Sequence, residues 1–422
     1  MAGREGTGAG RRTDPSPRGG ATTVAILGVI QMVMATVPFG IGALAPILRD
    51  RYDLTRGEVG LAVTAVFTSI ALLSMPMGRF ADRVGVSRAL TLSSVLVGSA
   101  AAAMGLAGRF QMLLAFLVVV GIGYAAVTPA TNKGVLVAVS PSSRGRAMGF
   151  KQMGVTAGGV VAAAILPSSI QGIGWEPTMF ALGATIGLLG WGGALAYRRR
   201  IHGGGPPRRA ETSNPPVAAA RLLGLGCIIG IMIGAQHAVG TYLSLFLVDA
   251  RGMAATTAAG ALTILHASGT GGRLAWGYVS DRLPGGRWRT VAVIGASSVA
   301  TLTILALVGD ALPLALLFVL IVLLGLTTQA GNAVFQTALA EEDEEHAGRA
   351  SGIGMSIGFA GPIVVPPVFG AGVDATGSYV TPFLLTAVAV AGAAVLAFRH
   401  SLARPTETLE PFEVREADGS LA

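Results

Sequence analysis

Long apolar runs, each followed by a short polar stretch, repeat along the whole chain. A run of about 20 apolar residues forms a helix that can cross the roughly 30 Å hydrocarbon core of a bilayer. The apolar residues run continuously and do not alternate with polar ones, which predicts membrane helices and not a β-barrel. We place twelve spans at about 23–47, 59–78, 89–107, 111–138, 146–167, 178–197, 220–246, 256–279, 290–308, 312–339, 350–371 and 379–398.

The composition supports a membrane protein. Of the 422 residues, 52% are hydrophobic and only 12% are charged, whereas soluble domains carry about 25% charged residues. The chain also has 61 glycines, and small residues let membrane helices approach each other closely. We therefore expect an all-α bundle whose partner is the lipid bilayer.

The basic residues indicate the orientation. The formal net charge is +8. Segments on the side of the N-terminus hold 22 lysines and arginines, and the opposite loops hold 5. The positive-inside rule then predicts that both termini are cytoplasmic. Because these residues flank apolar runs, we expect no nucleic-acid partner. Lysine occurs only at positions 133 and 151, which suggests a GC-rich bacterial genome and hence the plasma (inner) membrane of a bacterium.

Polar segments divide the predicted chain. The first 21 residues have no short apolar core, which predicts a disordered cytoplasmic tail and not a cleaved signal. An Arg-, Pro- and Gly-rich segment predicts a flexible cytoplasmic linker. The expected parts are a tail (1–21), an N-terminal six-helix half (22–199), a linker (200–218), a C-terminal six-helix half (219–399) and a tail (400–422).

Two pairs of sequence landmarks recur at an offset of about 200 residues, which indicates an internal duplication. The pattern G-x-x-x-D-R occurs at Gly78 to Arg83 and again at Gly277 to Arg282. Arg146-Ala-Met-Gly opens the fifth span, and Arg349-Ala-Ser-Gly opens the eleventh.

These landmarks resemble the major facilitator superfamily of secondary transporters. The stretch Gly78-Arg-Phe-Ala-Asp82-Arg83-Val-Gly-Val-Ser-Arg88 is similar to its signature loop, and the second half carries a degenerate copy. The resemblance covers about residues 22 to 400. It implies two pseudo-symmetric six-helix halves and alternating access. It also implies an inner gate, in which aspartates pair across the halves, built from Gly78, Asp82, Arg83, Arg88, Gly277, Asp281 and Arg282.

Two further stretches resemble anion-carrier branches of that superfamily. Asn132-Lys133, together with the segment from Arg146 to Gly154, is similar to cyanate and nitrate-type permeases. The segment from Gly272 to Arg282 is similar to oxalate/formate antiporters and monocarboxylate transporters, in which an arginine of the eighth helix contacts the substrate carboxylate. Position 273 matches that arginine.

Three basic residues fall inside predicted spans: Lys133, Lys151 and Arg273. A charge at the bilayer centre costs at least about 3 kcal/mol on insertion scales, so such groups are candidates for function. No acidic residue lies in a span at a similar depth, and a guanidinium binds a carboxylate with two parallel hydrogen bonds. We predict that Arg273 binds an anion, with the two lysines and Gln152 nearby. The alternative is structural pairing, or snorkelling for the lysines.

Other polar residues inside spans complete the predicted site. His266 lies seven residues before Arg273, on the same helix face. His237, in the seventh span, is a similar candidate. Each histidine could bind substrate or carry a proton; the alternative is a packed, hydrogen-bonded side chain. The resemblance places further cavity-lining residues in helices 1, 4, 7 and 10, although interhelical hydrogen bonds are the alternative. These are Gln31, Tyr124, Asn132, Tyr242, Gln329 and Asn332.

The sequence thus favours a monomeric secondary active transporter for a small anionic solute, an organic carboxylate in our interpretation. A proton-driven exporter of drugs or other hydrophobic solutes and a membrane sensor are the alternatives. Cys227 is the single cysteine, and no metal-ligand cluster or nucleophile–base pair stands out. The phosphate-binding pattern GxxxxGK[ST] is absent. We therefore expect no enzyme activity, no metal and no cofactor.

Overall fold

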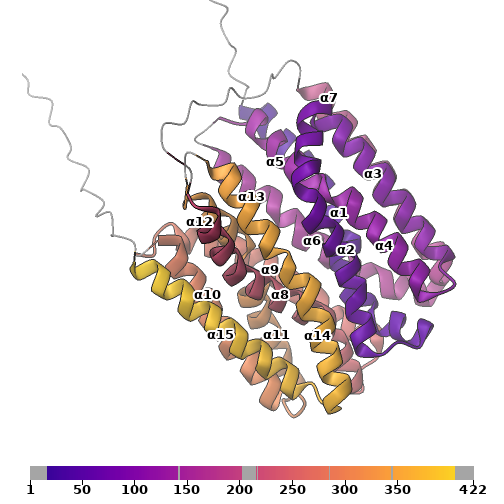
Figure 1. Ribbon diagram of the computed structural model, residues 1–422. Coiled ribbons are helices and arrows are strands. Elements are labelled where there is room, and N and C mark those ends of the chain that lie inside the picture. Colours follow the sequence, from indigo (N-terminus) through magenta and orange to yellow (C-terminus); the bar gives the residue numbers. More distant parts are fainter. Residues whose placement is uncertain are drawn as a thin grey trace, which may run out of the picture.

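The computed structural model describes residues 17–140, 143–201, 215, 217–284, 286–343 and 346–403. Most of the predicted linker and C-terminal tail, and residues 1–16 of the predicted N-terminal tail, lie outside these residues. All elements of the described part are helices (Figure 1). They are α1 (Pro17–Tyr52), α2 (Arg56–Val84), α3 (Val86–Ala103), η1 (Met104–Leu106), α4 (Phe110–Ala125), α5 (Val127–Ala138), α6 (Arg144–Ile173), α7 (Trp175–Arg200), α8 (Ala219–Asp249), α9 (Ala255–Ser280), α10 (Gly286–Val308), α11 (Leu314–Thr328), α12 (Asn332–Ala340), α13 (Ala347–Gly358), α14 (Ala360–Thr376) and α15 (Val380–Leu402).

Each predicted span corresponds to one helix or to two consecutive helices. Eleven helical segments of the described chain are long and apolar enough to cross a membrane. The segment outside that set is α9, the predicted eighth span. It has 26 residues, enough to cross a bilayer, but it carries His266 and Arg273, which are only 2% and 3% exposed. These two side chains face other helices and not lipid, which is why hydropathy alone undervalues α9.

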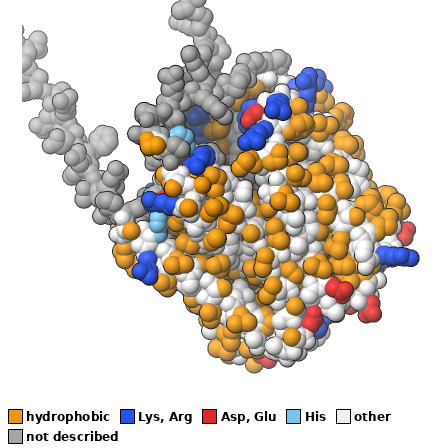
Figure 2. Space-filling view, viewed as in Figure 1, with side chains coloured by type: hydrophobic (Ala, Val, Ile, Leu, Met, Phe, Trp, Pro, Cys, Tyr) orange, Lys and Arg blue, Asp and Glu red, His pale blue; other side chains and the backbone are white. Residues whose placement is uncertain are grey.

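The helices form two bundles side by side (Figure 1). Helices α1 to α7 build the first half and α8 to α15 the second. The halves meet mainly along α2 and α14, α6 and α9, and α1 and α8. Apolar side chains cover much of the visible flank, and charged ones gather towards the two ends (Figure 2), as expected of a molecule embedded in lipid.

We name the two ends of this bundle by their residues. The linker end contains the start of α1, the end of α7, the start of α8 and the end of α15 (Figure 1). The distal end contains the α1–α2 connection and the end of α8. The start of α1 corrects one boundary: residues 17–21 are helical and not part of a disordered tail. Proline is favourable in the first turn of a helix, and α1 begins at Pro17.

Glycines allow the halves to approach each other closely. A side-chain carbon on Gly42 of α1 would lie 1.7 Å from the carbonyl oxygen of Gly240 of α8. A carbon on Gly60 of α2 would lie 2.5 Å from backbone atoms of Pro367 in α14. No larger residue fits at either position without moving a helix backbone. Small residues therefore set the spacing of the halves, as in other membrane bundles.

A buried carboxylate ties the second half together at the linker end. The Glu342 side chain is fully buried. It accepts a hydrogen bond from Trp288 Nε1 of α10 at 2.7 Å. It also forms an ion pair with Arg221 of α8, whose Nη2 lies 3.0 Å from the carboxylate. Its Oε1 also lies 2.9 Å from His400 Nε2 of α15. Three helices far apart in the sequence thus share one acidic group.

We expect Glu342→Gln to destabilise the protein. The substitution keeps the shape but removes the charge that Arg221 faces. Because the Arg221 side chain is 51% exposed and partly screened by solvent, we expect a loss of about 1–2 kcal/mol. The midpoint of thermal unfolding in detergent should fall by several degrees. Glu176→Gln is the control, because Glu176 is exposed on α7. Equal unfolding temperatures for the two variants would contradict a structural role for Glu342.

Candidate functional site

Helices α6 and α9 run antiparallel and join the halves near the middle of the bundle. A side-chain carbon added to Gly159 would lie only 2.9 Å from the His266 ring, so the two helices are in close contact here. One turn further towards the linker end, Thr270 Oγ1 donates to Thr156 Oγ1 at 2.7 Å. In the next contact, Arg273 Nη1 donates to the Gln152 carbonyl oxygen at 3.2 Å. The face of α9 predicted from the spacing of His266 and Arg273 therefore lies against the opposite half.

Arg273 lies in this interface without an acidic partner. Its side chain is buried. Besides the bond to Gln152, its Nε donates to the Gln329 carbonyl oxygen at 3.4 Å, and its Nη2 has no partner among the described residues. Both acceptors are neutral. The guanidinium thus keeps a whole positive charge and one unused donor nitrogen inside the bundle.

Two interrupted helices border this region. The fourth span breaks at Ala126, between α4 and α5, and the tenth breaks at 329–331, between α11 and α12. The two breaks are about 200 residues apart, the offset of the internal repeat. A break leaves backbone groups without helical partners, and the carbonyl of Gln329 is the one that Arg273 uses. Discontinuous helices of this kind border substrate sites in secondary transporters.

Lys151 lies on the first-half side of the region and is fully buried. Its Nζ donates to Asn132 Oδ1 at 2.6 Å and to Thr131 Oγ1 at 3.3 Å. Thr131 in turn donates to Gln31 Oε1 at 3.0 Å, and Gln31 Nε2 donates to the Tyr124 hydroxyl at 2.8 Å. Helices α1, α4, α5 and α6 each contribute a side chain to this network. Like Arg273, Lys151 has no carboxylate partner among the described residues.

The second half contributes a matching group of amides. Gln329 Nε2 donates to the Gln236 carbonyl oxygen at 3.0 Å, and Asn332 Nδ2 donates to Gln236 Oε1 at 2.7 Å. Gln236 is 1% exposed, and its own Nε2 has no partner in the described chain. The sequence analysis missed Gln236 and Thr131. An amide in the middle of the apolar α8 was the available signal for Gln236.

A small cavity lies between the halves beside these amides. Its free volume, about 10 Å³, holds about one water molecule. His237 packs against Phe39 and Phe67, with ring centroids 5.3 and 4.3 Å apart. The lining residues are Pro38, Phe39, Ile41, Gly42, Gln236, His237, Gly240, Thr241, His266 and Gln329.

Two predicted site residues lie elsewhere. Lys133 Nζ binds Asp82 at 2.8 Å near the linker end. Successive residues point about 100° apart around a helix, so Lys133 faces away from the network that Asn132 joins. Tyr242 lies towards the distal end, where its hydroxyl donates to the Arg56 carbonyl oxygen at 2.7 Å. Neither joins the cluster around Arg273 and Lys151.

The repeated G-x-x-x-D-R segments, expected to lock an inner gate when the carrier faces outward, pair within each half in this conformation. Asp82 binds Lys133 within the first half. Asp281 binds Arg287 at 2.6 Å, and Arg287 binds Glu341 at 3.0 Å, all within the second half. Among the remaining gate candidates, Arg83 and Arg88 are exposed, and Arg282 lies over the Tyr278 ring. In this conformation, no ion pair between described residues joins the halves at the linker end.

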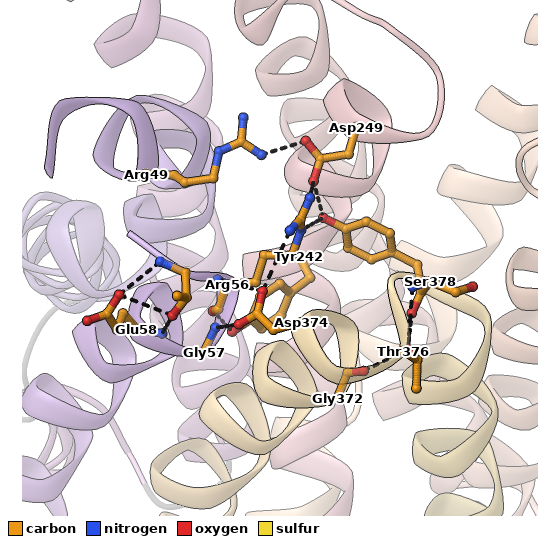
Figure 3. Close-up of polar contacts among 12 residues, drawn as sticks. Arg49, Arg56, Gly57, Glu58, Tyr242, Asp249, Gly372, Asp374, Thr376 and Ser378 are labelled. Atoms are coloured by element: carbon orange, nitrogen blue, oxygen red, sulfur yellow. Dashed lines mark hydrogen bonds and ion pairs between the residues drawn. The ribbon is translucent and has the colours of Figure 1, made fainter. Parts of the chain in front are cut away.

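Ion pairs do join the halves at the distal end, and the sequence analysis missed them (Figure 3). Asp249 of α8 accepts from Arg49 of α1 at 2.5 Å and from Arg56 of α2 at 2.7 Å. Arg56 also lies 3.6 Å from Asp374 of α14, whose carboxylate accepts from the backbone N–H groups of Arg56 and Gly57. The Tyr379 hydroxyl donates to Asp249 at 2.7 Å. We call these five side chains, Arg49, Arg56, Asp249, Asp374 and Tyr379, the distal lock.

The protonation of Tyr379 suits its place in the distal lock. Burial and the neighbouring Asp249 carboxylate raise the pKa of this phenol. Tyr379 therefore keeps its proton and remains a donor to Asp249 at physiological pH. One signal for the lock was available in the sequence, because charged residues end the first span at Arg49 and the seventh at Asp249, one repeat offset apart.

Comparisons of the sequence with known proteins point to one family. The profile described as Major Facilitator Superfamily matches residues 25–342. A probable sulfoacetate transporter, SauU, of Cupriavidus necator is 26% identical over 374 residues, which cover 82% of this chain and 85% of the relative. An uncharacterized MFS-type transporter of Mycobacterium tuberculosis is 24% identical, with 83% of this chain and 78% of the relative covered.

Solved structures share the fold. A bacterial homologue of the human lysosomal transporter Spinster, in an inward-facing and occupied conformation, superposes with a TM-score of 0.69 at 20% identity. The alignment covers 90% of this chain and 96% of that one. FucP, in the outward conformation, gives a TM-score of 0.64 at 18% identity, covering 91% and 99% of the two chains. The TM-scores of both superpositions support the architecture of two six-helix halves.

Proposed function

The chain belongs to the Major Facilitator Superfamily of transporters, and from this premise we propose that it carries a small organic anion across the membrane by alternating access. The observation that carries the proposal is the arginine–lysine pair at the interface of the halves. Arg273 and Lys151 are both buried, and within the described part of the chain both bind only neutral groups. Buried cations without partners are costly. A bound anion would supply the missing negative charge.

The position of the acidic residues supports the same choice. Every aspartate and glutamate of the described chain lies in a loop or within about two turns of a helix end. A proton-driven exporter of hydrophobic solutes would be expected to use a carboxyl group inside the membrane. No described residue offers one at the depth of Arg273. The relative named as a probable sulfoacetate transporter also points to an anionic substrate, since sulfoacetate carries a carboxylate and a sulfonate.

The two ends of the bundle suggest how access alternates. The excess of basic residues assigns the linker end to the cytoplasm, so the distal lock closes the opposite, outer side. Repulsion between Arg273 and Lys151 opposes closure of the halves around the site. An anion between them removes this repulsion, so the loaded carrier can close and then release the distal lock. The halves would rock about the site, as in other carriers of this architecture.

Thermal stabilisation of the purified protein tests the proposal. A ligand that binds only the folded state raises stability by about 2.7 kcal/mol at 100 times its dissociation constant. We expect small carboxylates or sulfonates to raise the unfolding midpoint, and quaternary ammonium and uncharged hydrophobic solutes to leave it unchanged. The Arg273→Gln variant should lose the response. Stabilisation by cations or hydrophobic solutes alone would overturn the proposal.

The two lysines provide a matched pair of variants. We expect Lys151→Gln to weaken anion binding at least about tenfold, because a hydrogen bond to a charged group contributes about 1.5–3 kcal/mol. Lys133→Gln should change it less than about twofold, because Lys133 pairs with the half-exposed Asp82. Titration calorimetry with the best anion from the thermal screen measures both. An equal loss in the two variants would place the anion outside the Lys151 network.

A further inference from the structure

Four buried polar atoms near the α6–α9 interface have no partner within the described chain: Gln152 Oε1, Gln236 Nε2, His266 Nδ1 and Arg273 Nη2. Buried polar atoms of folded proteins are nearly always paired. An unpaired group therefore calls for an explanation, and a missing ligand is one. These four atoms form two groups. Gln152 and Arg273 touch each other beside Lys151, whereas Gln236 and His266 line the small cavity.

One residue connects the two groups. The backbone of Gln329 accepts from Arg273, while its side chain donates to Gln236 and lines the cavity. The direction of α9 brings the groups closer still. Side chains on a helix lean towards its N-terminus, and the N-terminus of α9 is distal. The Arg273 guanidinium lies against the carbonyl oxygens of Gln152 and Gln329, about two turns along α9 from His266.

We propose that the central site has two subsites and takes a short two-headed organic acid; the inference rests on the proposed function. The first subsite, Arg273 with Lys151, binds a carboxylate or sulfonate. The second, Gln236 with His266, donates hydrogen bonds to a second acceptor group a few bonds away. That acceptor is a second acidic group or a hydroxyl oxygen.

The chemistry of the second subsite explains this choice. No lysine or arginine is among the described residues that line the cavity. The lining side chains with an unpaired nitrogen are the Gln236 amide and the His266 imidazole. His237 turns to Phe39 and Phe67, and Pro38 and Ile41 complete an apolar wall. A ligand with one polar head would leave the Gln236 amide without an acceptor, which costs free energy in a buried site.

Binding of matched probes to the full-length protein tests the inference. The probes are acetate and methanesulfonate, each with one head, and sulfoacetate, malonate and glycolate, each with two. We expect the best two-headed probe to bind at least about 30-fold more tightly than the one-headed ones, because it engages the second subsite. In Gln236→Leu this advantage should fall below about threefold. Gln111→Leu, an exposed position on α4, should behave as the wild type.

The outcomes distinguish the proposed anion-carrier function from the second subsite. If acetate and the two-headed probes bind equally well, and Arg273→Gln abolishes both, the anion carrier stands and the second subsite is wrong. If none of the anions binds, the proposed function fails and the inference falls with it. If Gln236→Leu keeps the full advantage, Gln236 is not the donor and the inference is overturned. The wild-type series decides the matter even if Gln236→Leu does not fold.

Discussion

Arg273→Lys should retain less than about 5% of wild-type uptake, although the positive charge stays. Lysine has a single nitrogen on a flexible stem, and arginine has a planar fork of five donors. Arg273 already uses two donor nitrogens on the carbonyls of Gln152 and Gln329, and its Nη2 has no partner among the described residues. A lysine can bind either the carbonyls of Gln152 and Gln329 or the substrate, but not both. Each lost charged hydrogen bond corresponds to a ten- to hundredfold effect.

The measurement is uptake into proteoliposomes of the anion that stabilises the purified protein best. Arg289→Lys is the matched control, because Arg289 is exposed at the start of α10 and donates only to the Pro284 carbonyl oxygen. It should transport like the wild type. Undiminished uptake by Arg273→Lys would mean that positive charge alone suffices and that the fork does not bind the substrate.

Asp249→Asn should shift the protein towards a state that is open at the distal end. Asp249 is the centre of the distal lock, with Arg49, Arg56 and Tyr379 as donors (Figure 3). Asparagine keeps some hydrogen bonds but loses the charge that faces two arginines. The side chain is 16% exposed, so we discount the loss to about 2 kcal/mol. That value corresponds to a roughly 30-fold change in the equilibrium between closed and open states.

A cysteine reporter measures this shift. In a Cys227→Ser background, Ala43→Cys places a thiol in the buried distal interface, because Ala43 is 1% exposed and packs against the second half. Its rate of alkylation by a maleimide in detergent solution should rise at least about tenfold when Asp249→Asn is added. Asp50→Asn is the control, since Asp50 binds Arg49 within the first half and is 70% exposed. Equal rates in the two variants would show that the lock does not hold the distal end closed.

The two predictions probe different parts of one cycle. We propose that Arg273 binds the substrate, so its variant should lose binding and uptake together. Asp249 lies near the distal end of α8, away from the site, so its variant should alter uptake while binding at equilibrium changes less. A loss of anion binding in Asp249→Asn as large as in Arg273→Lys would indicate that the lock residues contribute to the site itself.

Much of the fold was predictable because membrane insertion depends on local sequence. A segment spans the bilayer when about 20 consecutive residues are apolar, and the distribution of arginines orients it. These rules placed twelve helices, the division into halves and the candidates Arg273 and Lys151. They placed α9 as well, although hydropathy assigns His266 and Arg273 a penalty that applies only to residues facing lipid. Burial of His266 and Arg273 against α6 removes that penalty.

The detailed site depends on contacts between residues far apart in the chain. The sequence placed Asn132 and Lys133 side by side, but the helix directs one to Lys151 and the other to Asp82. Arg49 and Asp249 looked like separate loop charges, and they form an ion pair only because the halves close at the distal end. Hydropathy and spacing thus determined which segments cross the membrane and which charges enter it. The packing of the halves decided what each charge faces, because pairing between residues some 200 positions apart depends on helix rotation and register, which no local pattern records.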